Sequence, residues 1–229
     1  MSHLKNLQFH TPDLLQRKIL DIGSGRGGFL VDVVKSGGDI IGVEVNPDYI
    51  RQSRDLAKKE GVGVRIIEGE AEKLPFGDNT FDFVNISEVI EHIESPSEML
   101  GEVWRVLKKG GKAYLSVPSR YSYHDPHFHL YFVNWIPRFL SDAYIGVFGK
   151  HKDYFGKEAG RQSLKEMHYF TFRKIKKVLS EHGFKVVDIR EEKLKSILRK
   201  KFVFWPAFFI YKIINPLYFK AFHFLIIKN

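Results

Sequence analysis

A glycine-rich turn is the first stretch of the chain whose residue types and spacing could do chemistry. It lies between residues 18–22, an apolar run typical of a buried parallel strand, and a helical pattern over residues 27–36. Glycine lets the backbone turn sharply and lets a ligand approach closely, while the N-terminus of a helix offers unpaired N–H groups. The glycines of the turn are Gly23, Gly25, Gly27 and Gly28. Together they predict a cradle for a nucleotide-type ligand.

Two ligand classes fit this turn when it is taken by itself. Residues 23–28 have the spacing G-x-G-x-x-G, which is also the fingerprint of dinucleotide-binding proteins. Under either interpretation Glu44, at the end of the second expected strand, would bind ribose hydroxyls. Asp21 separates the two, because a carboxylate at this place would repel a pyrophosphate and attract an amino-acid ammonium. Asp21 therefore favours a ligand that carries an amino acid.

The elements that must position the turn alternate between strand and helix. Strands are expected at residues 18–22, 40–45, 64–67, 81–86, 113–117, 185–190 and 221–228. Helices are expected at residues 27–36, 47–60, 96–107 and 172–182, after a leader helix within residues 1–17 whose start signal is at 11–13. This alternation predicts an α/β fold, an open parallel sheet with helices on both faces. We expect one domain over residues 1–229.

Two segments interrupt the alternation. Residues 119–167 are rich in aromatic residues and histidine, and a connection of this length is usually functional or a lid. Residues 194–220 are apolar and basic and would form an insertion before the final strand. The longest uncharged run there, residues 202–211, is too short for a membrane-spanning helix, which needs about 20 apolar residues.

The composition of the chain indicates its cellular compartment and the kind of partner that it binds. The chain has no cysteine, which excludes disulfides and a thiolate metal site and is compatible with a reducing cytoplasm. The first ten residues lack the apolar core of a signal peptide. The net charge is +9, and no acidic residue follows Glu192, which indicates an anionic partner. Because these basic residues alternate with large aliphatic ones, we expect a cytoplasmic protein that contacts the inner face of a membrane and not nucleic acid.

Five motifs in order resemble those of class I S-adenosylmethionine (SAM)-dependent methyltransferases. They lie at residues 21–27, 44, 74–83, 88–93 and 107–111. The similarity covers residues 18–118 and returns weakly over 168–190, and the group it resembles most includes the ubiquinone-biosynthesis O-methyltransferases. The resemblance implies a Rossmann-like, seven-stranded, mostly parallel sheet with the last strand antiparallel. It also implies a methyltransferase with SAM as its cofactor.

Carried over by position, the resemblance implies roles for the residues of the turn. Gly23, Gly25 and Gly27 would pass close to the methionine part of SAM. Asp21 would help to hold the ammonium of SAM, and Glu44 would bind the ribose.

The resemblance assigns further residues beyond the third and fourth strands. Glu70 and Ala71 would flank the adenine, and Ser87 would lie beside the methionine. Glu70 stands where this family often has aspartate. Glu91 and His92 are expected to face solvent or to fix the local turn.

The methyl acceptor should meet side chains of residues 119–167. Methyl transfer is an in-line displacement, and a hydroxyl acceptor also needs a base whose pKa is near neutral. Our hypothesis is that His127 or His168 is this base and that Asp125 orients it. Alternatively, the histidines only pack and hydrogen-bond, or a local set binds a divalent ion. That set would be His124, Asp125, His127 and His129; because it has no distant partner, we expect no metal.

Two aromatic segments with interspersed Lys and Arg predict the class of acceptor. Residues 128–148 and 202–224 suit a bilayer interface, with cations on headgroups and aromatic rings below them. We therefore expect peripheral membrane contact and an apolar acceptor, which would be lipid-like, quinone-type or a lipid-linked saccharide. The resemblance agrees, since the ubiquinone-type enzymes act on lipid-soluble quinone precursors. The alternatives are a substrate lid, a SAM-binding membrane-associated protein without turnover, and an NAD-dependent oxidoreductase.

Overall fold

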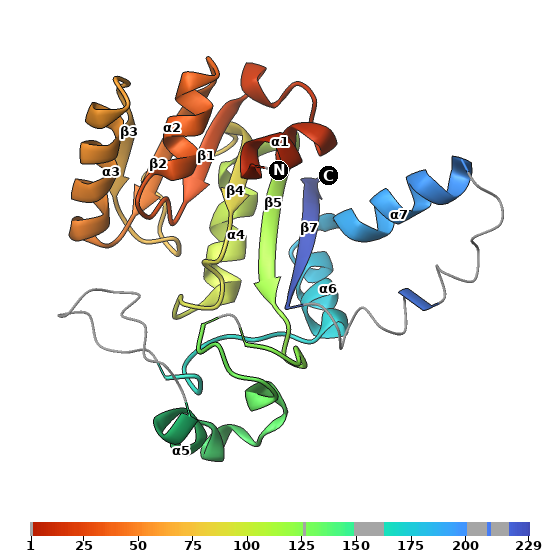
Figure 1. Cartoon of the computed structure of the whole chain (residues 1–229). Helices are drawn as coiled ribbons and strands as arrows, with labels where there is room; N and C mark the ends of the chain where they lie inside the picture. The colour runs from red at the N-terminus through yellow and green to blue at the C-terminus, as the bar shows by residue number, and fades with distance from the viewer. Residues whose placement is uncertain (1, 126, 149–162, 201–209, 212–219) are drawn as a thin grey trace.

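Seven strands form one sheet within the residues that the computed structural model describes, which are 2–125, 127–148, 163–200, 210–211 and 220–229. The strands are β1 (Lys18–Ile22), β2 (Asp39–Glu44), β3 (Arg65–Glu68), β4 (Phe81–Ile86), β5 (Leu107–Pro118), β6 (Phe184–Asp188) and β7 (Ala221–Lys228). Their order across the sheet is β3-β2-β1-β4-β5-β7-β6 (Figure 1). β7 runs antiparallel to β5 and β6, and the other pairs are parallel. The predicted α/β fold with an antiparallel last strand is confirmed.

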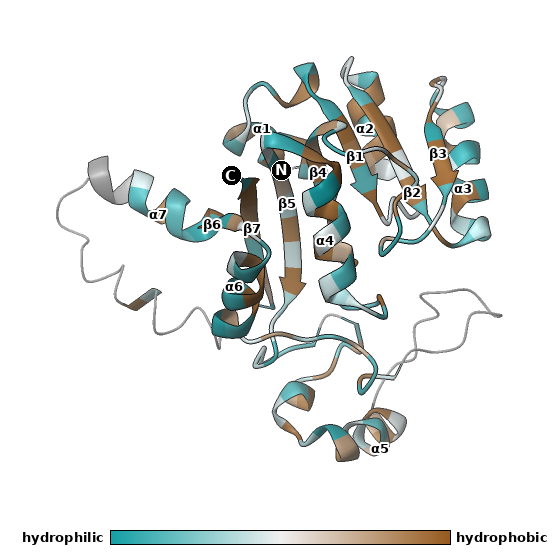
Figure 2. Cartoon of the chain, turned by 180° about the vertical axis from the view of Figure 1, so that it is seen from behind, coloured by the Kyte–Doolittle hydropathy of each residue, from teal (hydrophilic) through white to brown (hydrophobic). Residues whose placement is uncertain are grey.

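Helices cover both faces of the sheet (Figures 1 and 2). They are α1 (His3–His10), α2 (Gly28–Lys35), α3 (Pro47–Lys59), α4 (Pro96–Val106), α6 (Phe172–Glu181) and the start of α7 (Ile189–Lys200), whereas α5 (Arg138–Phe148) lies apart from the sheet. Buried residues of α4 and α6 pack on one face, and those of α1, α2 and the start of α7 pack on the other. In Figure 2 the strands between them are mostly brown, as expected for a sheet that is buried on both faces.

Successive side chains along a strand point to opposite faces of the sheet, so each central strand contributes residues to both of these cores. In β1, Leu20 and Ile22 join the core of α4 and α6, whereas Ile19 joins the core of α1 and α2. All three side chains are at most 1% exposed. β1 therefore holds the glycine turn that follows it against a rigid base.

The N-terminal helix differs from the prediction. α1 begins after Ser2, whose Oγ accepts a hydrogen bond from the N–H of Lys5, and it ends at Thr11. The residue before a proline is disfavoured in a helix, so Thr11 before Pro12 stops a helix here. The predicted start signal at residues 11–13 was therefore wrong, and a 3-10 turn, Leu14–Gln16, leads from it into β1.

The predicted insert leaves the sheet after β5 and returns to it before α6. In Figure 1 the described residues of this insert lie beyond the carboxyl ends of the parallel strands. The N–H of Arg120 donates to the carbonyl of Phe170, and the N–H of Phe170 donates to that of Pro118. Between these ends the insert has a small core of its own, made by Val133, Ile145, Leu164 and Met167. Most of the second predicted insertion, residues 194–220, lies outside the described residues.

Gly27, the last residue of the turn before α2, packs closely against Ser53 of α3, and a substitution at Gly27 tests this packing. Its φ is +77°, and a Cβ there would lie 1.8 Å from Oγ and 3.1 Å from Cα of Ser53. Gly27→Ala should therefore lower the free energy of unfolding by roughly 2–4 kcal/mol, measured by urea unfolding. Gly28→Ala is the matched control, because a Cβ at Gly28 meets nothing within 4 Å. It should change stability by less than about 1 kcal/mol, and equal losses in the two variants would contradict the prediction.

Candidate active site

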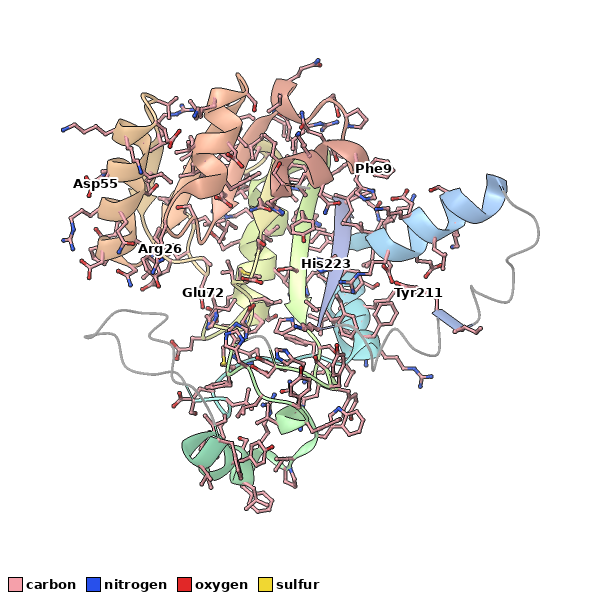
Figure 3. The ribbon with its side chains drawn as sticks, viewed as in Figure 1. Phe9, Arg26, Asp55, Glu72, Tyr211 and His223 are labelled. Carbon is pink, nitrogen blue, oxygen red and sulfur yellow. The ribbon has the colours of Figure 1, made fainter. Side chains whose placement is uncertain are left out.

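A cavity of about 720 Å³ opens at the carboxyl ends of β1, β2 and β4. Its volume is within the roughly 300–1,000 Å³ of small-molecule sites. In Figure 3 Glu72, a residue of its wall, lies between the strands and the insert. The predicted site residues that line the cavity are Gly23, Gly25, Glu44, Glu70, Ala71, Ser87 and His127. The cavity therefore joins residues from both halves of the prediction, the cofactor turn and the insert.

Glu44 ties the glycine turn to the end of β2. Its buried carboxylate accepts a hydrogen bond from the N–H of Gly25 at 2.7 Å through Oε2. Oε1 accepts from the N–H groups of Val45 at 3.0 Å and Asn46 at 2.9 Å. Hydrogen bonds to an ionised acceptor are among the strong ones, so the carboxylate has a fixed orientation. Glu44 thus shapes the wall, and its contact with ribose stays a prediction.

Gly23 and Gly25 give the turn its left-handed backbone, with φ angles of 65° and 53°. A Cβ at Gly23 would meet Cγ2 of Val89 at 2.5 Å, so only glycine lets the turn approach the segment after β4 this closely. Gly27 precedes α2 as its N-cap and does not line the cavity. Its proposed proximity to the methionine part of SAM also stays a prediction.

Asp21 lies behind the turn and is buried. Its Oδ1 accepts a hydrogen bond from Nδ2 of Asn85 at 2.7 Å, and Oδ1 of Asn85 is 2.9 Å from Nε2 of His3 in α1. Burial raises the pKa of the Asp21 carboxyl to about 7; the Asn85 hydrogen bond opposes this shift and the charge of Glu44 adds to it. Asp21 is not part of the cavity wall, so its role toward the ammonium of SAM is not shown directly.

Glu70 and Ala71 form the wall after β3, and α4 holds their segment in place. Arg105 donates to the carbonyls of Phe76 at 2.7 Å and Leu74 at 3.1 Å. Motif matching does not identify Arg105, because it acts on backbone carbonyls about thirty residues away. The E-x-x-R spacing on α4, which pairs Glu102 with Arg105, is the signal that could have drawn attention to it.

Ser87 and Glu88 continue the wall after β4. Glu88 has a φ of 56°, a left-handed backbone that is unusual for a residue other than glycine. Its N–H donates to Oγ of Ser116 at 2.8 Å, which helps to hold this conformation. Such conformations cost about 1–3 kcal/mol and cluster at functional sites.

His127 brings the insert to the cavity. Its Nδ1 is 2.8 Å from the hydroxyl of Tyr169, which donates to Oδ2 of Asp125 at 2.8 Å. The phenol has a single proton and gives it to the carboxylate, so Nδ1 of His127 must be the donor in the first bond. Oδ1 of Asp125 also accepts from the main-chain N–H of His127. Asp125 therefore orients His127 through Tyr169 and the backbone, and Tyr169 is the residue that sequence reasoning missed.

The charge on His127 depends on two opposing effects. Burial acts to lower the pKa of its imidazole, but the hydrogen bond and charge of Glu91, together with the charge of Asp125, outweigh burial and raise it. His168, the other predicted base, is half-buried, is not part of the cavity wall, and donates its main-chain N–H to the carbonyl of Glu91. The structure thus brings one of the two predicted bases to the cavity.

The histidines also form a cluster that the sequence did not predict. Among the described residues, one ligand atom each from Glu91, His92 and His127 lies within 4.8 Å of the others. The local set of His124, Asp125, His127 and His129 does not form such a group there. Glu91 was expected to face solvent or fix a turn, but it is 1% exposed, so the solvent-facing prediction was wrong. The missed signal is the acid–histidine pair between β4 and α4.

Known proteins resemble this chain in sequence and in fold. Residues 20–115 match the family model described as a methyltransferase domain. The uncharacterised protein MJ1123 of Methanocaldococcus jannaschii is 29% identical over 196 residues, which are 86% of this chain and 77% of that protein. Demethylmenaquinone methyltransferase of Chlorobaculum tepidum is 29% identical over 75% of this chain and 66% of that protein. A solved SAM-dependent methyltransferase of Thermotoga maritima is 27% identical, with a TM-score of 0.52 over 81% of this chain and 73% of that chain.

The likeness to other relatives covers less of their length. Sterol and quinone methyltransferases that are 31–36% identical are matched over only 26–42% of their own chains.

The cavity wall fits SAM on its own chemistry. Glu44 and Glu70 put two carboxylates on the cavity wall, and carboxylates accept hydrogen bonds from hydroxyl and amino groups such as those of a nucleoside. Gly23 and Gly25 add no side chain to the space beside them. Asp21 is a carboxylate directly behind this turn, where a pyrophosphate would be repelled. Residues 20–115 therefore form a SAM-dependent methyltransferase domain of the class I fold, with SAM as its cofactor, and the nicotinamide alternative falls away.

Proposed function

We propose that the protein transfers the methyl group of SAM to a hydroxyl of a lipid-like, quinone-type or lipid-linked saccharide acceptor. One observation carries the proposal: a single cavity runs from the cofactor residues to a polar end made by His92 and His127, below the aromatic insert. SAM supplies an electrophilic methyl group on its sulfonium. The chain then has to hold the acceptor in line with that group and let a proton leave.

The polar end of the cavity supports oxygen as the acceptor atom. The printed names of several relatives are those of C-methyltransferases, among them the sterol and the ubiquinone/menaquinone enzymes. A hydroxyl acceptor needs a group that takes its proton, and His92 and His127 on the cavity wall, with Glu91 beside them, are groups of this kind. The proposed place for the acceptor hydroxyl is therefore beside these three residues.

The exposed aromatic surface of the insert supports a lipid-like acceptor. Trp135, Phe139, Val147 and Phe148 are between 54% and 74% exposed. Exposed aromatic and aliphatic side chains gathered in this way suit a bilayer interface; Arg138, at the start of α5, does not add to that surface, because its guanidinium lies over the Tyr169 ring. No helix in the described part of the chain is long and apolar enough to cross a membrane. We propose that the insert touches the membrane from its cytoplasmic face.

The second proposed contact, residues 202–224, has less support. Residues 202–209 and 212–219 lie outside the described residues. Phe222 and Phe224 belong to β7 and are at most 2% exposed, so they pack in the core and do not reach a membrane surface.

The acceptor itself is the most direct test. Native mass spectrometry of the purified protein should show a co-purified lipid, quinone or lipid-linked sugar, and the extract should take up label from methyl-labelled SAM. Cleavage with hydriodic acid, which releases the label as methyl iodide from an ether and not from a carbon-bound methyl group, distinguishes the two products. A product methylated on carbon would contradict the proposed oxygen acceptor, and no product with any extract would favour a SAM-binding protein without turnover.

The raised pKa of Asp21 predicts how the stability of the fold depends on pH. Its pKa of about 7 lies above the usual 3.8 of a free carboxyl, so ionised Asp21 destabilises the fold. This effect is absent below pH 4, grows between pH 4 and 7, and is complete above pH 7. Asp21→Asn should raise the free energy of unfolding at pH 8, by as much as about 4 kcal/mol, and leave it unchanged near pH 4.

The same variant should weaken cofactor binding. Without the carboxylate, the affinity for S-adenosylhomocysteine at pH 8 should fall about tenfold or more, measured by calorimetry. In the natural protein this affinity should fall as the pH drops from 8 to 6, because Asp21 takes up a proton, and Asp21→Asn should flatten that dependence. An unchanged affinity with an unchanged pH profile would show that Asp21 does not serve the ammonium.

Two exposed residues of α5 test the membrane contact. Phe139 and Val147 are 73% and 74% exposed on the outward side of the helix. Because burying one such side chain is worth about 1.5–3 kcal/mol, Phe139→Ser with Val147→Ser should reduce association with anionic vesicles at least about tenfold in a flotation assay. Phe9→Ser is the matched control, since Phe9 is 58% exposed at the opposite end of the molecule (Figure 3). Absence of flotation by the natural protein at low salt would refute the contact.

A further inference from the structure

We propose that Glu91, His92 and His127 bind a divalent first-row transition-metal ion through two imidazoles and one carboxylate. Their ligand atoms already lie within 4.8 Å of one another. Glu91 and His92 come from the segment between β4 and α4, and His127 comes from the insert. Such an ion would therefore join the insert to the sheet edge, at the end of the cavity where the proposed function places the acceptor hydroxyl.

The carboxylate of Glu91 is buried and only partly satisfied. It is 1% exposed, and its Oε2 has no hydrogen-bond partner among the described residues. Oε1 lies 3.5 Å from Nε2 of His127 and 4.0 Å from Nε2 of His92. A buried carboxylate oxygen without a donor is unfavourable, and it marks a place where a positive centre would be stabilised.

The hydrogen bond at the other side of His127 prepares its ring as a ligand. Nδ1 donates to the hydroxyl of Tyr169, so Nε2 is the nitrogen that can keep its lone pair, and it faces Glu91. Histidines that bind metals usually donate their second ring N–H to an oxygen in this way. Tyr169 is in turn fixed by Asp125, whose Oδ2 also accepts from Asn134.

A proton on His127 is the simpler positive centre, but it accounts for less of the arrangement. It would satisfy Oε1 of Glu91 and leave Oε2 without a partner. A metal ion has ligand distances of about 2.0–2.2 Å to imidazole nitrogen and carboxylate oxygen and can reach all three residues after small side-chain movements. Imidazole ligands favour ions such as Zn²⁺, Fe²⁺ or Co²⁺ over Mg²⁺.

The ion would take part in the proposed transfer by holding the acceptor oxygen. Coordination to a divalent ion lowers the pKa of a hydroxyl, so its proton passes to solvent. The oxygen–methyl bond forms while the sulfur–methyl bond of SAM breaks, which leaves a methyl ether and S-adenosylhomocysteine. In this arrangement His127 is a metal ligand and not the general base, and the ion replaces the base.

Cobalt binding by the full chain tests the proposal without relying on turnover. The protein is freed of metal with a chelator, saturated with S-adenosylhomocysteine and titrated with Co²⁺, whose visible absorption reports coordination. One ion should bind per chain, and Zn²⁺ should displace it. His92→Gln should lower the Co²⁺ affinity at least about tenfold, since one of three ligands is lost. His92 is half-buried, so this variant should fold, and circular dichroism checks that it does.

His129→Gln is the matched control, because His129 is an exposed histidine of the same insert outside the cluster. It should bind Co²⁺ as the natural protein does, and an equal loss in both variants would overturn the proposal by showing non-specific binding. The proposal is also overturned if S-adenosylhomocysteine binds but Co²⁺ does not, while the proposed function then still stands with His127 as the base. If S-adenosylhomocysteine itself does not bind, the proposed function fails, and the cobalt titration alone decides the metal site.

Discussion

The carboxylate of Glu44 is the point on which the cofactor half of the structure depends. By accepting hydrogen bonds from Gly25, Val45 and Asn46, it joins the loop after β1 to the loop after β2. Asn46 is also the N-cap of α3, where its side chain accepts from the N–H groups of the first turn. One carboxylate therefore sets the start of two helices and the shape of the wall between them. Glu44, which the resemblance assigns to ribose binding, therefore also holds the two loops together.

The central strands of the sheet could be predicted because they are buried on both faces. An apolar run such as β1 or β4 has no other stable place in a chain of this size, so both strands were predicted with the residues that they have. β5 starts six residues earlier than predicted, because its first part is the polar stretch Lys108–Gly111, which follows the pairing of Leu107 with Phe81 at the start of β4. α7 was not predicted, since its sequence has only a weak apolar stripe and its start is set by Asp188, whose carboxylate accepts from the N–H groups of Arg190 and Glu191.

Some residues of the candidate site could be predicted from their spacing in the sequence, whereas others are recognised only because the fold brings distant parts of the chain together. The glycines and Glu44 lie in one stretch of sequence with a fixed spacing, and the structure puts Gly23, Gly25 and Glu44 on one wall. Nothing in the sequence separates His127 from His168, because both lie in or beside the insert. Only the fold shows that His127 meets Glu91 across thirty-six positions of the chain. Tyr169 was missed for the same reason, since its partners Asp125 and His127 lie more than forty residues away.

The insert is attached to the rest of the molecule by main-chain hydrogen bonds, which affects how such enzymes can evolve. Arg120, Phe170 and His168 join the insert to the rest of the molecule through main-chain N–H groups, and the acceptors are main-chain carbonyls. Every residue type except proline can make such a bond, so these anchors place little restriction on which side chains follow them. The residues that cover the acceptor end can therefore change while the sheet and the cofactor wall stay as they are. A fold built in this way can diversify its substrates by replacing one segment, and the family match, which ends at residue 115, stops just before that segment begins.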